Sequence, residues 1–168
     1  MHFTATRLGG RNIEITNEHK EPIGCVSYAA RLSERSKISV RDADGFTIVP
    51  RGKDAGIMRN GSTYAILRLG NGQKLEMILE NGKRLLVSKN KSFEPTYTIV
   101  DEFDNEVASI KSRYDWKALC YHYDIDVRRK AVDKDTRATL PFLLVYCTQH
   151  ARIAQAPPAL GKIAASFL

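Results

Sequence analysis

Acidic and histidine side chains near the end of the longest apolar-alternating stretch are the first candidates for chemistry. In residues 118–127, His122, Asp124 and Asp126 occupy alternate positions, so a strand would place all three on one face. Two carboxylates at this spacing could act as an acid and base pair or bind a cation. A hard cation requires six or more oxygen ligands, however, and no glycine-bearing calcium loop accompanies the strand. We therefore expect these residues to form the solvent-facing side of a half-buried strand.

Other titratable residues flank the apolar stretch that follows. Asp133 and Asp135 precede it, where a carboxylate is stabilised by a helix dipole, so we expect them to cap a helix. Binding of a ligand by this loop is the alternative. His150 comes late in the same segment, where packing or a dipole interaction is expected. The sequence contains no G-x-S-x-G motif, phosphate-binding loop or dinucleotide fingerprint. We therefore expect no enzyme activity, no catalytic residues, no metal site and no cofactor.

The three cysteines, Cys25, Cys120 and Cys147, are too far apart in sequence for a zinc knuckle or a CxxC redox pair. Their odd number argues against a disulfide scaffold. Each has apolar or aromatic neighbours, so we expect all three to be small buried side chains of the core. The first residues lack the apolar segment of a secretory signal, which predicts a cytoplasmic location.

Basic side chains are concentrated in the last third of the chain. The protein has 26 Lys or Arg and 19 Asp or Glu, a net charge of +7, and residues 111–168 contribute ten basic and five acidic side chains. Such a surplus attracts phosphate groups on anionic lipid or on nucleic acid. It can equally serve only to keep a protein soluble. Two basic loops, residues 113–117 and 128–137, supply the candidate ligand-binding residues: Arg113, Trp116, Lys117, Arg128, Arg129, Lys130, Lys134 and Arg137.

The elements that must position these residues are mainly short strands. Dipeptides with the positive backbone angles of tight hairpins occur four times: Asp44-Gly45, Asn60-Gly61, Asn71-Gly72 and Asn81-Gly82. Between them, branched and aromatic residues alternate with polar ones, which predicts a sheet with one packed face and one solvated face. The predicted strands are residues 12–16, 23–28, 37–41, 46–49, 63–69, 74–79, 84–88, 97–100, 106–111 and 118–127.

One helix is predicted from about Thr139 to Gln155. Thr139 is the expected cap, Pro141 suits the first turn, and the Pro157-Pro158 pair ends the helix. Its first turns are apolar on every side, which a surface helix would not tolerate. The apolar run is also shorter than the roughly 20 residues needed to span a bilayer. A helix of this kind requires a sheet around it, and a closed sheet leaves no exposed edge strands.

We therefore predict a mainly β (α+β) protein, a closed antiparallel β-barrel that encloses a hydrophobic C-terminal α-helix. With 43% hydrophobic and 27% charged residues, the chain has the composition of one soluble globular domain. We expect a single domain over residues 1–168, with a core of about residues 12–155 and a C-terminal tail of residues 157–168 that either docks on the barrel or frays. The expected assembly is a monomer or a weak oligomer with no transmembrane segment.

Four segments resemble a known superfamily. They are Tyr97–Asp101, the V-A-S-I-K strand within Glu106–Lys111, the Y-x-I-x-V strand within Tyr121–Val127, and the apolar helix through Phe142–Cys147. Together they look like the tubby C-terminal-like superfamily, which includes plant LURP-one-related proteins, bacterial relatives and phospholipid scramblases. The resemblance covers about residues 13–155. It implies a closed barrel of about twelve strands threaded by a hydrophobic helix, and its tubby branch is associated with phosphoinositide binding.

Scrambling of lipids is not expected, because Thr148, Gln149, His150 and Arg152 interrupt the helix and the extra Cys-rich and Pro-rich regions of scramblases are absent. The leading hypothesis is a non-enzymatic module whose basic loops bind anionic phospholipid headgroups or another phosphate-bearing ligand. A structural or protein-interaction domain without a small-molecule ligand is the alternative. Nucleic acid is the third and weakest, since only one loop, residues 113–117, combines aromatic and basic side chains.

Overall fold

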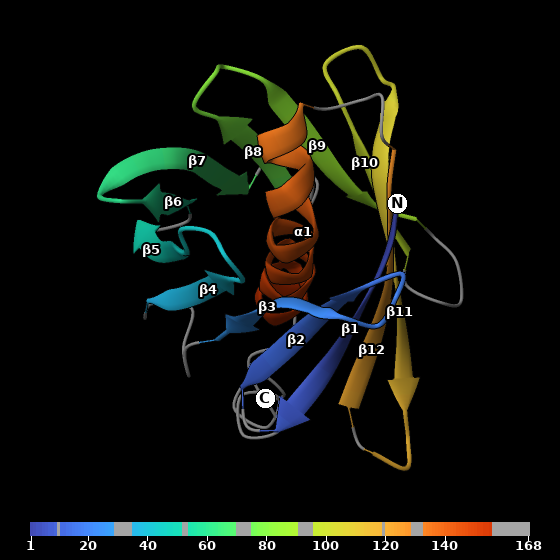
Figure 1. The fold of residues 1–168 in the computed structure, drawn as a ribbon. Helices are drawn as coiled ribbons and strands as arrows, with labels where there is room; N and C mark the ends of the chain where they lie inside the picture. Colours follow the sequence, from blue (N-terminus) through green and yellow to red (C-terminus); the bar gives the residue numbers. More distant parts are fainter. Residues whose placement is uncertain are drawn as a thin grey trace.

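The computed structural model describes residues 1–9, 11–28, 35–51, 54–69, 75–90, 96–118, 120–128 and 133–155. Twelve antiparallel strands form a closed barrel around one helix, as predicted (Figure 1). The strands are β1 (His2–Gly9), β2 (Asn12–Asn17), β3 (Pro22–Ser27), β4 (Ser36–Val40), β5 (Phe46–Arg51), β6 (Asp54–Arg59), β7 (Ser62–Leu69), β8 (Leu75–Leu79), β9 (Arg84–Lys89), β10 (Thr96–Val100), β11 (Glu106–Asp115) and β12 (Cys120–Val127), and the helix is α1 (Lys134–Gln155).

Each strand pairs with its neighbours in sequence, and the pairing of β1 with β12 closes the ring. His2 lies opposite Asp126 and Thr6 opposite His122 in that pairing. In such a meander the connections alternate between the two ends of the barrel. We call the end at which α1 begins the entry end and the end at which it finishes the exit end. The turns after β2, β4, β6, β8 and β10 lie at the entry end, and those after β1, β3, β5, β7, β9 and β11 lie at the exit end.

The middle of the helix is buried inside the barrel. Phe142, Leu144 and Val145 are each 0% exposed, and every residue from 139 to 149 is buried. Inward-facing side chains of the strands, such as Ile15, Ile57 and Ile110, complete one continuous core. This confirms that the apolar segment is enclosed by strands of its own chain, and the burial of so much apolar surface is the main source of stability.

The helix begins five residues earlier than predicted. Asp133 caps it, because its carboxylate accepts hydrogen bonds from the Thr136 backbone N–H at 2.8 Å and the Thr136 hydroxyl at 2.7 Å. The capping role expected for Asp133 is thus confirmed and the one expected for Thr139 is wrong. Thr139 lies inside the helix and its hydroxyl lies 2.9 Å from the Tyr64 hydroxyl. Pro141 also lies inside the helix rather than in its first turn.

Two strands of the barrel were not predicted. β1 precedes residue 12, so the barrel begins before the predicted core, and β6 contains Gly56 in a stretch with weak β-propensity. Asn60 and Gly61 adopt the expected positive φ angles of a hairpin turn, at 50° and 81°. In the turn after β4 the positive φ belongs to Asp42 rather than to Asp44-Gly45. Gly45 is instead required by close packing, since a Cβ there would lie 2.6 Å from the Ile38 carbonyl oxygen.

Several other expectations concern single residues and segments. Cys120 and Cys147 are buried as expected, whereas Cys25 is only half-buried, because it lies opposite Glu14 and Ser39 in the outward phase of β3. The Asn71-Gly72 turn, Pro157-Pro158 and the tail of residues 157–168 lie outside the described residues. Among the residues described, no helix combines the length and hydropathy that crossing a membrane requires.

Candidate functional site

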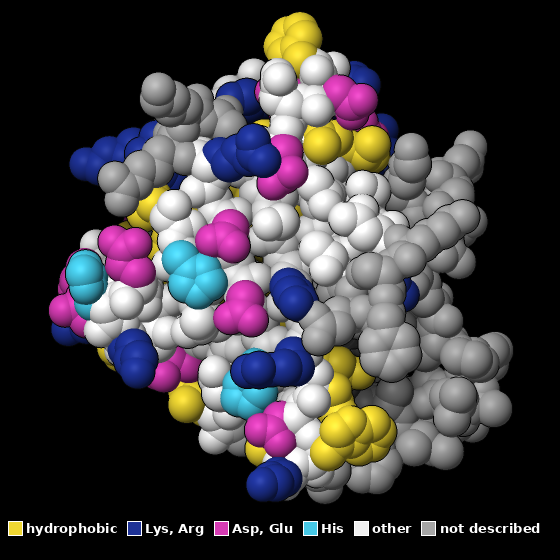
Figure 2. Space-filling model, turned by 90° about the vertical axis from the view of Figure 1, so that its right-hand side faces the viewer, with side chains coloured by type: hydrophobic (Ala, Val, Ile, Leu, Met, Phe, Trp, Pro, Cys, Tyr) yellow, Lys and Arg dark blue, Asp and Glu magenta, His cyan; other side chains and the backbone are white. Residues whose placement is uncertain are grey.

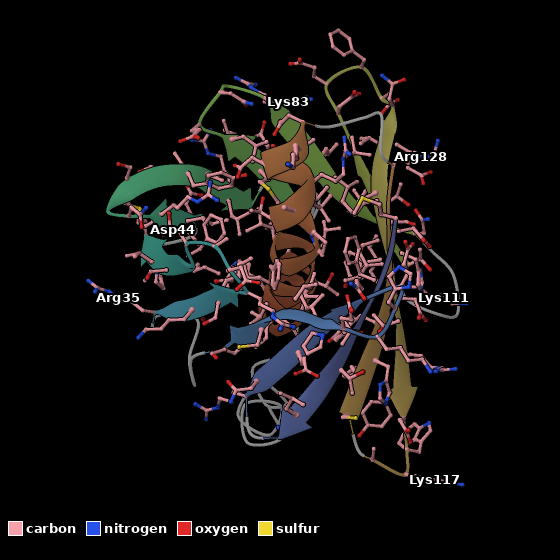
Figure 3. All side chains as sticks on the ribbon, viewed as in Figure 1. Arg35, Asp44, Lys83, Lys111, Lys117 and Arg128 are labelled. Carbon is pink, nitrogen blue, oxygen red and sulfur yellow. The ribbon has the colours of Figure 1, made fainter. Side chains whose placement is uncertain are left out.

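The two basic loops predicted to bind a ligand lie at opposite ends of the barrel. Lys117 follows β11 at the exit end, and Arg128 follows β12 at the entry end (Figure 3). The eight residues of β12 separate them by about 25 Å at roughly 3.3 Å per residue. The two loops therefore do not form one site.

Most of the described cations in the entry-end loop are paired with a carboxylate or partly buried. Arg128 forms an ion pair with Glu106 at 3.1 Å. Lys134 is exposed as the first residue of α1, and Arg137 is half-buried one turn further on. Arg129 and Lys130 lie outside the described residues. Among the described cations of this loop, Lys134 is the one that is exposed and has no described carboxylate partner.

Arg59, which the sequence analysis did not single out, holds the start of α1. Its guanidinium donates hydrogen bonds to both carboxylate oxygens of Asp135 at 3.0 and 3.1 Å. The same group lies over the rings of Phe46 and Tyr64, 5.1 and 5.4 Å from their centroids. Asp135 is thus committed to a structural ion pair. Cation–π contacts of this kind leave no sequence signal, because the three partners come from different strands.

The exit-end loop between β11 and β12 is held in a defined shape. The Asp115 carboxylate accepts the backbone N–H groups of Lys117 at 2.8 Å and Ala118 at 3.1 Å. These hydrogen bonds hold the pKa of Asp115 below its usual value, since they stabilise the carboxylate. Tyr114 packs edge-on against Trp116, with ring centroids 4.7 Å apart, and Trp116 remains 80% exposed. The turn therefore presents a supported indole to solvent.

The His122, Asp124 and Asp126 side chains are on the outer face of β12, as expected. Asp126 Oδ1 lies 3.0 Å from His2 Nδ1, and His122 lies 3.6 Å from Asp115. Cys120 Sγ lies 3.7 Å from His122 Nε2. Among the described residues, no group of three or more such side chains is arranged to bind a metal ion. These residues act as the polar outer side of a half-buried strand.

Two exposed apolar side chains and three cations gather at the exit ends of neighbouring strands. We define the exit patch as Leu8, Arg11, Arg113, Trp116 and Lys117, which lie on or between β1, β2, β11 and β12. Leu8 is 62% exposed, and all three cations are exposed. Leu8 and Arg11 were not predicted from the sequence, because they lie about 100 residues from Arg113 in the chain. Only the closure of the barrel between β1 and β12 brings them to the same end.

Exposed cations without a described carboxylate partner are more numerous at the exit end than at the entry end. At the entry end, Arg41, Arg59, Arg84 and Arg128 each lie within 4.0 Å of a carboxylate. At the exit end, no described carboxylate lies within ion-pair distance of these exposed residues: Arg11, Arg35, Lys37, Arg51, Lys89, Arg113 and Lys117. Arg68, also at the exit end, lies 3.7 Å from Asp54.

The two ends therefore differ in sign. Counting the described connections and two element residues on each side, the entry end carries twelve Asp or Glu and seven Lys or Arg. The exit end carries three Asp or Glu and seven Lys or Arg by the same count. On the side of the barrel between the ends, positive and negative side chains are interspersed (Figure 2). The charge asymmetry thus runs along the barrel axis rather than across one face.

Two hollows on the described surface lie away from Trp116. One of ≈ 420 Å³ lies by β8, β9 and β10 near the entry end, and its lining includes Glu76, Asp101, Glu102 and Asp104. A second, of ≈ 380 Å³, lies beside it around Lys83 and Glu102. The first hollow is lined by more carboxylates than cations, and the second by one of each. Neither therefore suits a phosphate group.

Tyrosines line the interior of the exit end around the last turns of the helix. Tyr28 stacks on Tyr146 with centroids 5.9 Å apart, and Gln149 donates a hydrogen bond to the Tyr123 hydroxyl. His150 lies against Tyr146, and its buried Nδ1 has no hydrogen-bond partner among the described residues. Burial lowers the pKa of His150, because it disfavours the charged imidazolium. This confirms packing as one role of His150.

The arrangement at the exit end can bind anions through cations and an exposed indole. Comparison with known proteins finds no matching family model, no matching curated protein and no matching solved structure.

Proposed function

We propose that this protein is a non-enzymatic module that binds anionic phospholipid surfaces through its exit end. The observation that carries the proposal is the set of exposed exit-end cations without carboxylate partners, of which Arg11, Arg113 and Lys117 form the exit patch with the exposed side chains of Trp116 and Leu8. Cations of this kind attract anionic lipid by about 1 kcal/mol each near the surface. Trp side chains favour the interface between headgroups and acyl chains, where the ring is partly desolvated.

The polarity of the barrel also supports this orientation. An acidic entry end is repelled by an anionic surface, so the molecule should approach with its exit end first. The resemblance to the tubby C-terminal-like superfamily, whose tubby branch is associated with phosphoinositides, supports the same class of ligand. Of the residues predicted from sequence, Arg113, Trp116 and Lys117 belong to the proposed site, and Leu8 and Arg11 join them.

Vesicle flotation with two charge-matched variants tests the proposal. One variant combines Arg113→Glu and Lys117→Glu at the exit end, and the other combines Arg128→Glu and Lys134→Glu at the entry end. Both change the net charge by the same amount. We expect wild type to bind vesicles of phosphatidylcholine with phosphatidylserine but not pure phosphatidylcholine, and the exit-end variant to bind at least about 30-fold more weakly.

The entry-end variant should bind like wild type, because its substitutions lie far from the proposed surface. Equal loss in both variants would show that net charge alone drives adsorption and would contradict a specific exit-end site. Equal binding of wild type to neutral and anionic vesicles, or to neither, would also reject the proposal. The sole tryptophan, Trp116, gives a second readout, since its emission should shift to shorter wavelength on anionic vesicles only.

A further inference from the structure

The longest described strand, β11, joins an acidic turn at the entry end to a basic turn at the exit end. The turn before it carries Glu102, Phe103 and Asp104, which we call the entry tip. The exit tip consists of Arg113, Trp116 and Lys117, at the far end of the strand. Figure 1 shows the two turns at opposite ends of the molecule. The ten residues of β11 place them about 30 Å apart at roughly 3.3 Å per residue.

Each tip presents one aromatic ring among charges of one sign. Phe103 is 76% exposed and Trp116 is 80% exposed, and they are the most exposed large hydrophobic side chains described. Glu102 and Asp104 are exposed, and no described cation lies within ion-pair distance of either. The cations of the exit tip likewise have no described carboxylate partner. The tips are therefore complementary in charge, and each leaves an aromatic ring in water.

Both tips are held in shape by the carboxylate of a half-buried aspartate. The Asp101 carboxylate accepts the backbone N–H groups of Phe103 and Asn105 at 2.9 Å, and Asp115 does the same for Lys117 and Ala118. These hydrogen bonds hold the pKa of Asp101 below its usual value. A turn that is already ordered loses little conformational entropy when it binds.

We propose that two copies of this chain associate head to tail, with the entry tip of one against the exit tip of the next. Like tips repel, so a two-fold symmetric dimer through either tip is disfavoured. Opposite tips attract, and contact between them removes Phe103 and Trp116 from water. Such an interface is heterologous and leaves a free tip at each end, so it propagates into chains unless the ends meet. The proposal does not depend on the proposed function.

The association is weak and sensitive to salt, because the charge pairs are exposed and screening shortens their range. Sedimentation velocity of wild type should show the average mass rising with protein concentration at low ionic strength. High salt should return it to the monomer. Trp116 emission should shift to shorter wavelength over the same concentration range, since this single tryptophan becomes buried in the contact.

Two one-sided variants provide the decisive test. The entry variant combines Glu102→Gln with Asp104→Asn, which removes both charges of the tip and keeps a residue tolerant of the positive φ at position 104. The exit variant combines Arg113→Glu with Lys117→Glu. Each variant alone should be monomeric, because one of its two tips is lost. An equimolar mixture should form a 1:1 dimer and nothing larger, since one intact entry tip and one intact exit tip remain.

Far-UV circular dichroism and melting temperature provide the folding control for both variants. Wild type that stays monomeric at low salt and high concentration would overturn the proposal, as would a mixture that contains only monomers. Association that persists in either variant alone would place the contact elsewhere and would also overturn it. Vesicle binding separates this proposal from the proposed function, because the entry variant should keep vesicle binding while losing self-association.

Discussion

Arg59 is the residue that connects the start of α1 to the barrel wall. It combines a two-oxygen ion pair to Asp135 with ring contacts to Phe46 and Tyr64. We predict that Arg59→Ala lowers the free energy of unfolding by about 1–2 kcal/mol, measured by urea denaturation. Arg59→Lys should recover only a small part of this loss, because an ammonium cannot match the planar guanidinium. Full recovery by lysine would show that charge alone matters.

Asp133 links stability to pH through the cap of α1. The Thr136 backbone N–H stabilises the carboxylate and lowers the pKa of Asp133 below its ordinary value of 3.8. A lowered pKa in the folded state contributes stability that is present above the unfolded pKa and is lost as pH falls through the folded pKa. We therefore predict that Asp133→Ala costs about 1 kcal/mol at neutral pH. The cost should shrink as pH falls below 3.8 in denaturation curves, and a pH-independent cost would contradict this account.

Gly24 shows how one position in a strand permits the helix to pack. It lies in β3 with a φ of +152°, and a Cβ there would lie 2.1 Å from the Ser39 carbonyl oxygen and 2.8 Å from Phe142 Cε1. We predict that Gly24→Ala lowers the free energy of unfolding by roughly 3 kcal/mol or prevents folding, because strand and helix must both move. Gly82→Ala is the matched control.

Gly82 also has a positive φ, of +80°, but nothing lies within 4 Å of a Cβ at that turn. Its substitution should therefore cost only the backbone strain, about 1 kcal/mol. Thermal or chemical denaturation of both variants measures the difference. Equal costs at the two positions would mean that the contact with Phe142 does not constrain β3.

The elements were predictable where a local pattern determines them. The Asn60-Gly61 turn and the alternation along β12 depend only on neighbouring residues, so both could be predicted. The burial of the helix could be predicted because its first turns are apolar on every side. The start of α1 was mispredicted because the cap depends on the Asp133 contact to Thr136, whereas Thr139 offers the same side-chain chemistry. β1 and β6 were missed because small residues such as Ala5 and Gly56 weaken their apolar pattern.

At the scale of the whole molecule, the end of the barrel at which a charged residue lies determines which other charged residues lie near it. Arg113 and Lys117 were predicted from the sequence to share a loop with an aromatic residue, and they were assigned to the same binding role as Arg128 because the three are close in the chain. In a meander each further strand moves the next connection to the other end, so missing one strand reverses the assignment. Arg11 joins Arg113 only through the pairing of β1 with β12, a contact between segments over 100 residues apart.

Burial of the helix inside the barrel makes the molecule one cooperative unit. The barrel has no packed interior without α1, and α1 has no solvent-tolerant face without the barrel, so neither should persist alone. We predict that Leu144→Ala, at a side chain that is 0% exposed, lowers the free energy of unfolding by about 2–5 kcal/mol. Native-state hydrogen exchange should show this loss equally at slowly exchanging amides of α1 and of β12, because they open together. A loss confined to the helix amides would instead show that α1 can leave an intact barrel.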